Sequence, residues 1–139
     1  MDEKLLHILL VDDDEVDVIN VQRSFKKNNI RNPLYIANNG LEALDLLRGQ
    51  GAAAIPGPRR LILLDLNMPK MNGYACVEAL RSETVGTAAP VLMISTEDRP
   101  GDADRAYWAG ANLYLTKPVS GDRLVRVATM LTAGGGEAQ

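Results

Sequence analysis

Five short apolar runs, separated by stretches with helical periodicity, constrain the fold of this chain more than any other feature. The runs are Ile8 to Val11, Leu34 to Ala37, Leu61 to Leu66, Val91 to Ile94, and Leu113 to Leu115. Their residues do not alternate cleanly between apolar and polar, which is typical of parallel strands that are buried on both faces. We therefore expect one parallel sheet with right-handed crossovers and with helices on both of its faces.

The segments between the runs carry the pattern of amphipathic helices. Asn39 followed by Glu42 resembles a capping box at the start of the second helix, whose apolar positions include Leu41, Leu44 and Leu47. Three further apolar stripes lie at helical spacing: Val18, Val21 and Phe25; Ala103, Ala106 and Gly110; and Leu124, Val127, Ala128 and Leu131. The expected order is a strand followed by a helix, repeated five times.

Length and composition indicate a single domain without a membrane segment. The chain has 139 residues, of which 46% are hydrophobic, and this suffices for one well-packed domain. We assign residues 1–132 to that domain, and interpret residues 49–58 as a connecting loop and residues 133–139 as a disordered tail. The start of the chain, MDEKLL, is not a signal peptide, and no apolar stretch approaches the ~20 residues that span a bilayer.

Charge and cysteine content exclude several classes of partner and compartment. The net charge is -3, and no cluster of Lys and Arg stands out that could neutralise a run of phosphates, so no direct nucleic-acid partner is expected. Cys76 is the only cysteine, so no internal disulfide can form. These features predict a cytoplasmic protein.

Polar residues gather at the carboxyl ends of the predicted strands. Asp12 and Asp13 follow the first strand, Asp65 lies in the third, Ser95 ends the fourth, and Lys117 follows the fifth. In open parallel sheets, ligands bind outside the carboxyl ends of the strands, where the strand order reverses. The sequence thus predicts three carboxylates, a hydroxyl and an ammonium at one rim.

The chemistry of that rim points to phosphoryl transfer beside a metal ion. Carboxylates brought together resist joint ionisation unless a cation offsets them, and a hard divalent ion such as Mg2+ suits an all-oxygen cluster. Lys117 could stabilise charge on a transferring phosphoryl group, and Asp65 is a candidate nucleophile for an aspartyl phosphate. Asp65 interrupts the apolar run LILLDL, where an unpaired carboxylate would be costly, so a functional role is favoured for it.

Simpler interpretations exist for the other residues of the rim when each is taken alone. The acidic run DDDE at positions 12–15 is typical of a solvated cluster that caps a helix, and this interpretation is favoured for the run by itself. Lys117 alone would be a surface lysine, and Ser95 alone a satisfied core hydroxyl. The functional interpretation depends on their convergence at one rim.

Four segments in order resemble the receiver domain of two-component response regulators. They are ILLVDDDE, LILLDLNMPKMNG, PVLMIST and LYLTKPV, and the resemblance covers the chain from about Lys4 to Leu131. It implies a flavodoxin-like, doubly wound fold of five strands and five helices, with strand order 2-1-3-4-5. The long loop before the third strand, NPLYIANNGLEAL and YLTKPV are similar to small single-domain regulators that accompany phytochrome-type sensor kinases.

The resemblance also implies a metal site next to the phosphoacceptor. Asp65 would be the phosphoacceptor, Asp13 the metal-binding acid, and Asp12 would lie beside it, bound to the metal directly or through water. Asn67 would give its backbone carbonyl to the metal, which would be Mg2+ or Mn2+. A shift by one residue would move the ligands to Asp13 and Asp14, but the end of the apolar run at residue 11 favours the first register.

Switch and lifetime residues follow from the same resemblance. Ser95 would follow the phosphoryl group, Lys117 would contact a phosphoryl oxygen and form a cis peptide with Pro118, and Tyr114 occupies the position of the switch aromatic. Two further polar positions would tune the attack of water on the acyl phosphate: Asn67 and Glu97.

The implied function is a phosphorylation-dependent switch and not an enzyme. The chain would accept a phosphoryl group from a sensor histidine kinase, of the phytochrome type if the narrower resemblance holds. It would then bind a downstream target or a phosphotransfer protein, as a monomer or as a homodimer. Two alternatives remain: a pseudo-receiver that binds partners without phosphorylation, and a phosphatase with an aspartyl-phosphate intermediate, whose DxDx motif would be expected after the first strand.

Overall fold

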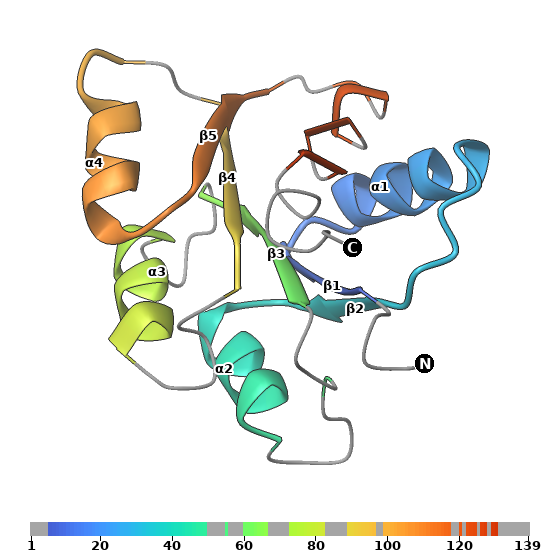
Figure 1. Cartoon of the computed structure of the whole chain (residues 1–139), viewed down its shortest axis with the longest axis horizontal. Coiled ribbons are helices and arrows are strands. Elements are labelled where there is room, and N and C mark those ends of the chain that lie inside the picture. Colours follow the sequence, from blue (N-terminus) through green and yellow to red (C-terminus); the bar gives the residue numbers. More distant parts are fainter. Residues whose placement is uncertain are drawn as a thin grey trace.

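The computed structural model of the chain shows an α/β fold built around one parallel sheet (Figure 1). It describes residues 6–49, 55, 60–66, 73–82, 89–96, 99–117, 120, 122–124, 126, 127, 129 and 130. Its elements are β1 (His7–Val11), α1 (Glu15–Lys27), β2 (Leu34–Ala37), α2 (Gly40–Arg48), β3 (Arg60–Asp65), α3 (Gly73–Ser82), β4 (Val91–Ser95), α4 (Asp102–Ala109) and β5 (Leu113–Thr116). The strand order is β2-β1-β3-β4-β5 with every pairing parallel, which confirms the predicted flavodoxin-like class.

Alternate residues of the central strands pack into two separate hydrophobic cores, one on each face of the sheet. Successive side chains in a strand point to opposite faces, so a fully apolar strand supplies both cores at once. One core contains Leu9, Ile62 and Met93 together with buried residues of α2, α3 and α4. The other contains Leu10 and Leu63 of the strands, packed with residues of α1 and of the segment near residue 124. Figure 1 shows these helices in layers on the two sides of the sheet.

The second helix begins as its sequence predicts, but one leucine faces the solvent. Asn39 Oδ1 accepts a hydrogen bond from Glu42 N at 2.9 Å, which caps the helix. Leu44 and Leu47 are buried as expected, whereas Leu41 is 69% exposed, so its assignment to the apolar face was wrong. The buried face runs at helical spacing from Gly40, and this places the next residue outside the contact with the sheet.

The predicted last helix and the predicted loops are described only in part. Residues 122–124, 126, 127, 129 and 130 are helical, and Leu124 is buried, with its N–H donated to Ser120 O at 3.0 Å. Within the predicted 49–58 loop, Ile55 is buried and donates its N–H to Leu46 O at 3.1 Å. The predicted tail, residues 133–139, lies outside the described residues. Within the described ranges, no helix combines the length and the apolar character that crossing a membrane requires.

Arg81, in the last turn of α3, forms hydrogen bonds with the segments that immediately precede β4 and β5. Its guanidinium donates hydrogen bonds to Gly110 O at 2.9 Å, to Ala89 O at 2.6 Å and to Asn112 Oδ1 at 2.7 Å. Asn112 Oδ1 also accepts the N–H of Val91 at 2.8 Å. The planar guanidinium matches several acceptors in a fixed geometry, so it holds the starts of these two neighbouring strands together. The opposite ends of the same strands carry the residues of the candidate site.

Replacing Arg81 by methionine should therefore destabilise the protein well beyond the loss of a surface charge. We expect Arg81→Met to lower the free energy of unfolding by about 2–4 kcal/mol, because part-buried carbonyls lose their donors. Urea titration followed by circular dichroism measures this change. The matched control is Arg48→Met on the surface of α2, where the arginine makes a long 3.8 Å ion pair with Asp45. Equal losses in the two variants would contradict the role given to Arg81.

Candidate functional site

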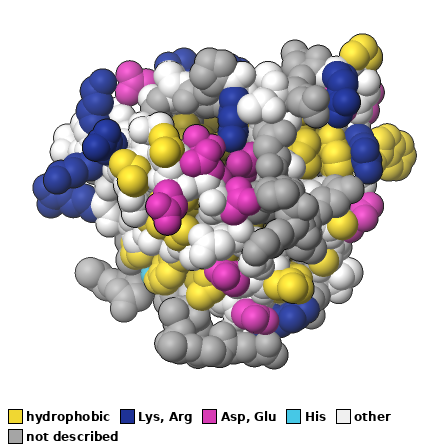
Figure 2. All heavy atoms as spheres, turned by 180° about the vertical axis from the view of Figure 1, so that it is seen from behind, with side chains coloured by type: hydrophobic (Ala, Val, Ile, Leu, Met, Phe, Trp, Pro, Cys, Tyr) yellow, Lys and Arg dark blue, Asp and Glu magenta, His cyan; other side chains and the backbone are white. Residues whose placement is uncertain are grey.

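Three carboxylates meet at the carboxyl-end rim of the sheet. Asp12 follows β1, Asp65 ends β3, and Asp17 lies near the start of α1. Each offers one oxygen atom, and these atoms all lie within 4.8 Å of one another. Asp12 and Asp65 are each only 4% exposed, whereas Asp17 is partly exposed. Asp and Glu side chains also gather near the middle of the face that Figure 2 shows.

The acidic run after β1 divides between the site and the start of α1. Asp12 Oδ1 accepts the N–H of Asp14 at 2.9 Å, and Asp14 Oδ1 accepts the N–H of Val16 at 2.9 Å, so Asp14 is the N-cap of α1. Asp13, the predicted metal-binding acid, is exposed and does not belong to the group of three carboxylates. The structure therefore places Asp12 in the site and Asp14 at the helix cap, while the role of Asp13 stays a prediction.

Lys117 supplies a positive charge between two of the carboxylates. Its Nζ lies 3.0 Å from Asp17 Oδ2 and 3.2 Å from Asp65 Oδ2. Burial alone would lower the pKa of the Lys117 ammonium, but the hydrogen bond to Asp17 and the charge of Asp65 outweigh this and raise the pKa above its ordinary 10.5. Lys117 is thus held in its charged form beside the predicted phosphoacceptor. Its backbone N–H donates to Ser95 O at 2.6 Å, which joins the ends of β4 and β5.

Burial and neighbouring carboxylates raise the pKa of Asp12, so that this side chain holds a proton up to near neutral pH. Burial is the largest cause that raises the pKa of Asp12 to about 7, and the N–H of Asp14 opposes it. The charge of Asp65, a hydrogen bond with Asp65 and the charge of Asp17 raise it further. The Asp12 carboxyl therefore resists ionisation, as expected for a buried acid with like charges beside it.

The donor set fits a hard divalent cation. In octahedral coordination at about 2.1 Å, ligand oxygens lie roughly 3.0 Å apart when adjacent and 4.2 Å apart when opposite. A spread of at most 4.8 Å between the three carboxylate oxygens is compatible with such a shell once the side chains adjust. Three carboxylates and one ammonium leave a formal charge of two negative, which a divalent cation would neutralise. This acidic triad could therefore hold a divalent ion.

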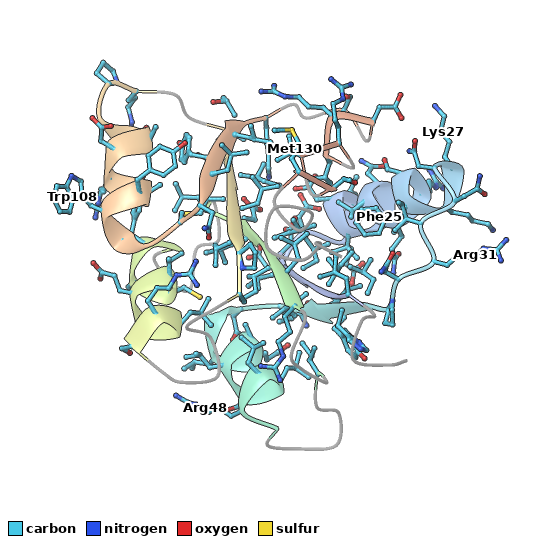
Figure 3. All side chains as sticks on the ribbon, in the orientation of Figure 1. Phe25, Lys27, Arg31, Arg48, Trp108 and Met130 are labelled. Carbon is cyan, nitrogen blue, oxygen red and sulfur yellow. The ribbon has the colours of Figure 1, made fainter. Side chains whose placement is uncertain are left out.

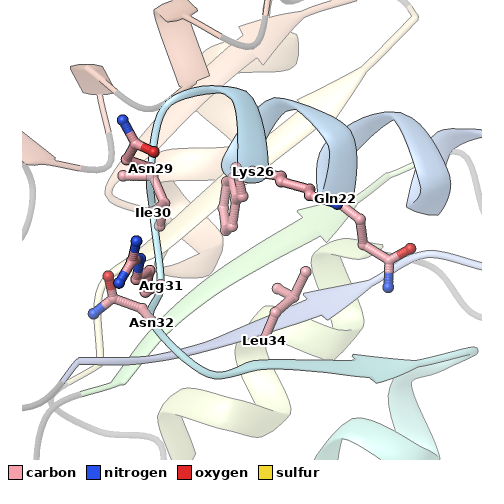
Figure 4. A pocket seen from close by; sticks show the side chains of 8 residues that line it. Gln22, Lys26, Asn29, Ile30, Arg31, Asn32 and Leu34 are labelled. Carbon is pink, nitrogen blue, oxygen red and sulfur yellow. The ribbon is translucent and has the colours of Figure 1, made fainter.

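A cavity of about 450 Å³ opens at these residues. Asp12, Asp17, Asp65 and Lys117 form its charged part, and its remaining wall is mostly apolar, formed by Leu10, Val21, Ile94 and Leu124 together with Asn20 and Thr96. A second cavity, of about 530 Å³, lies at the other end of α1 (Figure 4). Its described lining includes Lys26 and Arg31 but no carboxylate, so it offers no comparable metal or phosphoacceptor chemistry.

The other predicted residues differ in how far the structure describes them. Ser95 is fully buried at the end of β4, next to the strand position opposite Asp65. Tyr114, in β5, is only 8% exposed and belongs to the core beside α3 and α4, so the predicted switch aromatic already points inward. Three predicted positions lie outside the described residues: Asn67, Glu97 and Pro118.

Sequence reasoning missed Asp17, although a signal was present. Asp17 lies four residues before Val21 and eight before Phe25, two members of the predicted apolar stripe of α1. Residues four apart in a helix share one face, so a carboxylate in line with this stripe must lie at the edge of the buried surface. The capping pattern around residue 14 also indicates that Asp17 lies in the first turn of α1, close to the end of β1.

Comparison with known proteins identifies the family. Residues 8–129 match the family described as "Response regulator receiver domain". The chain belongs to this family. As a receiver domain it is a phosphoaccepting signalling module and not a catalytic enzyme, and receiver domains pair with histidine kinases.

Proteins similar to this receiver domain include response regulators described as phytochrome or bacteriophytochrome regulators. It is 34% identical over 110 residues to "Response regulator Rcp1" of Synechocystis, covering 79% of this chain and 75% of that protein. The Mn2+-bound form of Rcp1 superposes with a TM-score of 0.72 at 31% identity, covering 93% of this chain and 92% of that one. A two-component response regulator from Legionella pneumophila gives 0.81 at 31%, covering 92% and 98%, and the bacteriophytochrome response regulator RtBRR gives 0.78 at 32%, covering 91% and 78%.

The raised pKa of Asp12 makes cation binding and stability depend on pH in a defined direction. A carboxyl whose folded-state pKa rises from 3.8 to about 7 stabilises the fold at low pH, and this contribution is lost as the pH rises between these values. A divalent cation replaces the proton, so it should raise the melting temperature more at about pH 8 than at about pH 6. Differential scanning fluorimetry with and without Mn2+ measures this. Asp12→Asn should shrink the difference between the two pH values, and an undiminished difference would contradict the assignment.

Proposed function

We propose that this receiver domain accepts a phosphoryl group on Asp65 from a histidine kinase, with Mg2+ bound by Asp12 and Asp65. The observation that carries the proposal is the ammonium of Lys117, which lies 3.2 Å from a carboxylate that is itself buried at a strand end among other acids. A buried nucleophilic carboxylate next to a fixed cation is the arrangement that phosphoryl acceptance requires, because negative charge accumulates on the transferring group.

The proposed transfer is a displacement at phosphorus. An oxygen of Asp65 attacks the phosphorus of a phosphohistidine, the new P–O bond forms, the P–N bond breaks, and the imidazole leaves with its electron pair. Lys117 contacts a phosphoryl oxygen, and Ser95 offers its hydroxyl to another. When bound by Asp12 and Asp65, Mg2+ would supply Lewis-acid stabilisation of the phosphoryl oxygens. Asp13 and the carbonyl of Asn67 stay proposed additional ligands, and Asn67 and Glu97 stay proposed regulators of hydrolysis.

The proposed output is a change in partner binding on the surface around α4 and β5. Ser95 would move toward the phosphoryl group and bias the packing near Tyr114, which shifts a pre-existing equilibrium between two conformations. On α4, Tyr107 is 45% exposed and Trp108 is 90% exposed, and Figure 3 shows Trp108 projecting away from the helix. Such side chains suit contact with a downstream protein, a phosphotransfer protein or a second copy of the chain. We place this exchange in the cytoplasm, with a phytochrome-type sensor kinase as the proposed phosphodonor.

Phosphorylation by a small donor tests the first part of this proposal. Incubation with acetyl phosphate and Mg2+ should add one phosphoryl group, which mass spectrometry after borohydride reduction should map to Asp65. Asp65→Asn should abolish the modification while keeping the fold, because the amide preserves size but removes the nucleophilic oxygen. Circular dichroism checks the fold. An unlabelled wild type that still binds partners would identify a pseudo-receiver adaptor instead.

Ser95→Ala tests the proposed coupling of phosphorylation to output. This variant should still be phosphorylated at Asp65, since the nucleophile and Lys117 remain, but it should lose most of the phosphorylation-dependent change in self-association or partner affinity. Sedimentation velocity of phosphorylated and unphosphorylated protein, wild type beside variant, makes the comparison. A full change in the variant would exclude Ser95 as the relay.

A further inference from the structure

We propose that Asp17 is a positioning residue, which holds the ammonium of Lys117 at the rim so that it is in place for an incoming phosphoryl oxygen. This inference rests on the function proposed above. It starts from the two contacts of the ammonium, which lies 3.0 Å from Asp17 Oδ2 and 3.2 Å from Oδ2 of the phosphoacceptor Asp65.

The lysine needs such an anchor because only its backbone is fixed by the sheet. The N–H of Lys117 is bonded to Ser95 O, but the side chain carries its charge on a flexible four-carbon stem and is 24% exposed. Without a second acceptor the ammonium would lose little by turning into water, and holding it would cost rotamer entropy. Asp17 and Asp65 approach it from different elements, α1 and β3, so together they fix its position.

Asp17 is itself positioned independently of the lysine. The N-cap at Asp14 fixes the start of α1, and Phe25 buries the far end of the same helix in the core. Asp17 therefore presents its carboxylate from a rigid element, and that carboxylate is 34% exposed compared with 5% for Asp65. It thus offers the ammonium an acceptor that is more exposed to solvent than the phosphoacceptor.

This placement has a consequence for the phosphorylated protein. Once Asp65 carries a phosphoryl group, its negative charge moves outward to the phosphoryl oxygens. The ammonium can then turn to those oxygens while it keeps Asp17 as an acceptor, so it never loses both partners. Asp17 thus acts on the reaction through Lys117 and not by touching the phosphoryl group.

A double-mutant cycle separates this role from a direct role in binding the metal. At saturating Mg2+, Asp17→Asn should slow labelling of Asp65 by acetyl phosphate about five- to twenty-fold, whereas Asp17→Glu should keep more of the rate because it keeps the charge. In a Lys117→Gln background, Asp17→Asn should change the residual rate by less than about two-fold, because the ammonium that Asp17 positions is absent. Asp45→Asn, which removes an exposed carboxylate on α2, serves as the charge-loss control and should match the wild type.

Three outcomes of the cycle would overturn the inference. They are an unchanged rate in Asp17→Asn, an equal loss of rate in the presence and absence of Lys117, and a higher Mg2+ requirement with an unchanged maximal rate. The last outcome would make Asp17 a metal ligand only.

NMR of the lysine side chain tests the contact between Asp17 and Lys117 independently of phosphorylation. If acetyl phosphate does not label the wild type, the proposed function fails, but this measurement still decides the role of Asp17. The Lys117 ammonium should give a slowly exchanging 15Nζ signal in the wild type, because two carboxylates hold it. This signal should vanish in Asp17→Asn and remain in Asp45→Asn. A signal that persists in Asp17→Asn would overturn the inference regardless of the labelling result.

Discussion

Repulsion among carboxylates at one rim, offset by the ammonium of Lys117, is the constraint on which the rest of this structure depends. Buried acids are costly unless they are paired or coordinate a metal, and the chain places Asp12 and Asp65 there at 4% exposure each. The sheet order brings their strands side by side, β3 pairs with β4, and β5 delivers Lys117 to the same end. Helices packed on both faces of the sheet then exclude water from the strands, which strengthens the charge interactions at the rim.

Much of this arrangement could be predicted from the sequence because continuous apolar runs leave few alternatives to buried parallel strands. The strand ends, and with them the meeting of Asp65 and Lys117, follow from topology. Asp17 was missed because its contribution depends on which way α1 faces, a tertiary property that propensity does not reveal. Leu41 was misplaced for the same reason, since the buried face of α2 begins one residue earlier. The hydrogen bonds of Arg81 to backbone carbonyls leave no sequence signal at all.

The acidic run after β1 shows why a helix cap and a functional site were hard to tell apart. Both interpretations hold, for different members of the run: Asp14 caps α1, and Asp12 lies buried in the triad. A hydrogen bond from the Asp14 N–H to Asp12 Oδ1 joins the two. The same turn therefore sets the direction in which α1 leaves the sheet and the orientation of the buried carboxylate, so neither can change without the other.

The wide separation of Lys117 from its partners along the chain has a bearing on biosynthesis. All three carboxylates have been synthesised by residue 65, but the ammonium that offsets them arrives only at residue 117, 100 positions after Asp17. A nascent chain that already contains β1, α1 and β3 thus carries the three carboxylates without the positive charge of Lys117. Strands β4 and β5, which extend the sheet beyond β3, are also still missing. Emergence of β5 from the ribosome brings Lys117 to the rim, so the charge of the three carboxylates is first offset late in synthesis, well after the segments that carry them have been made.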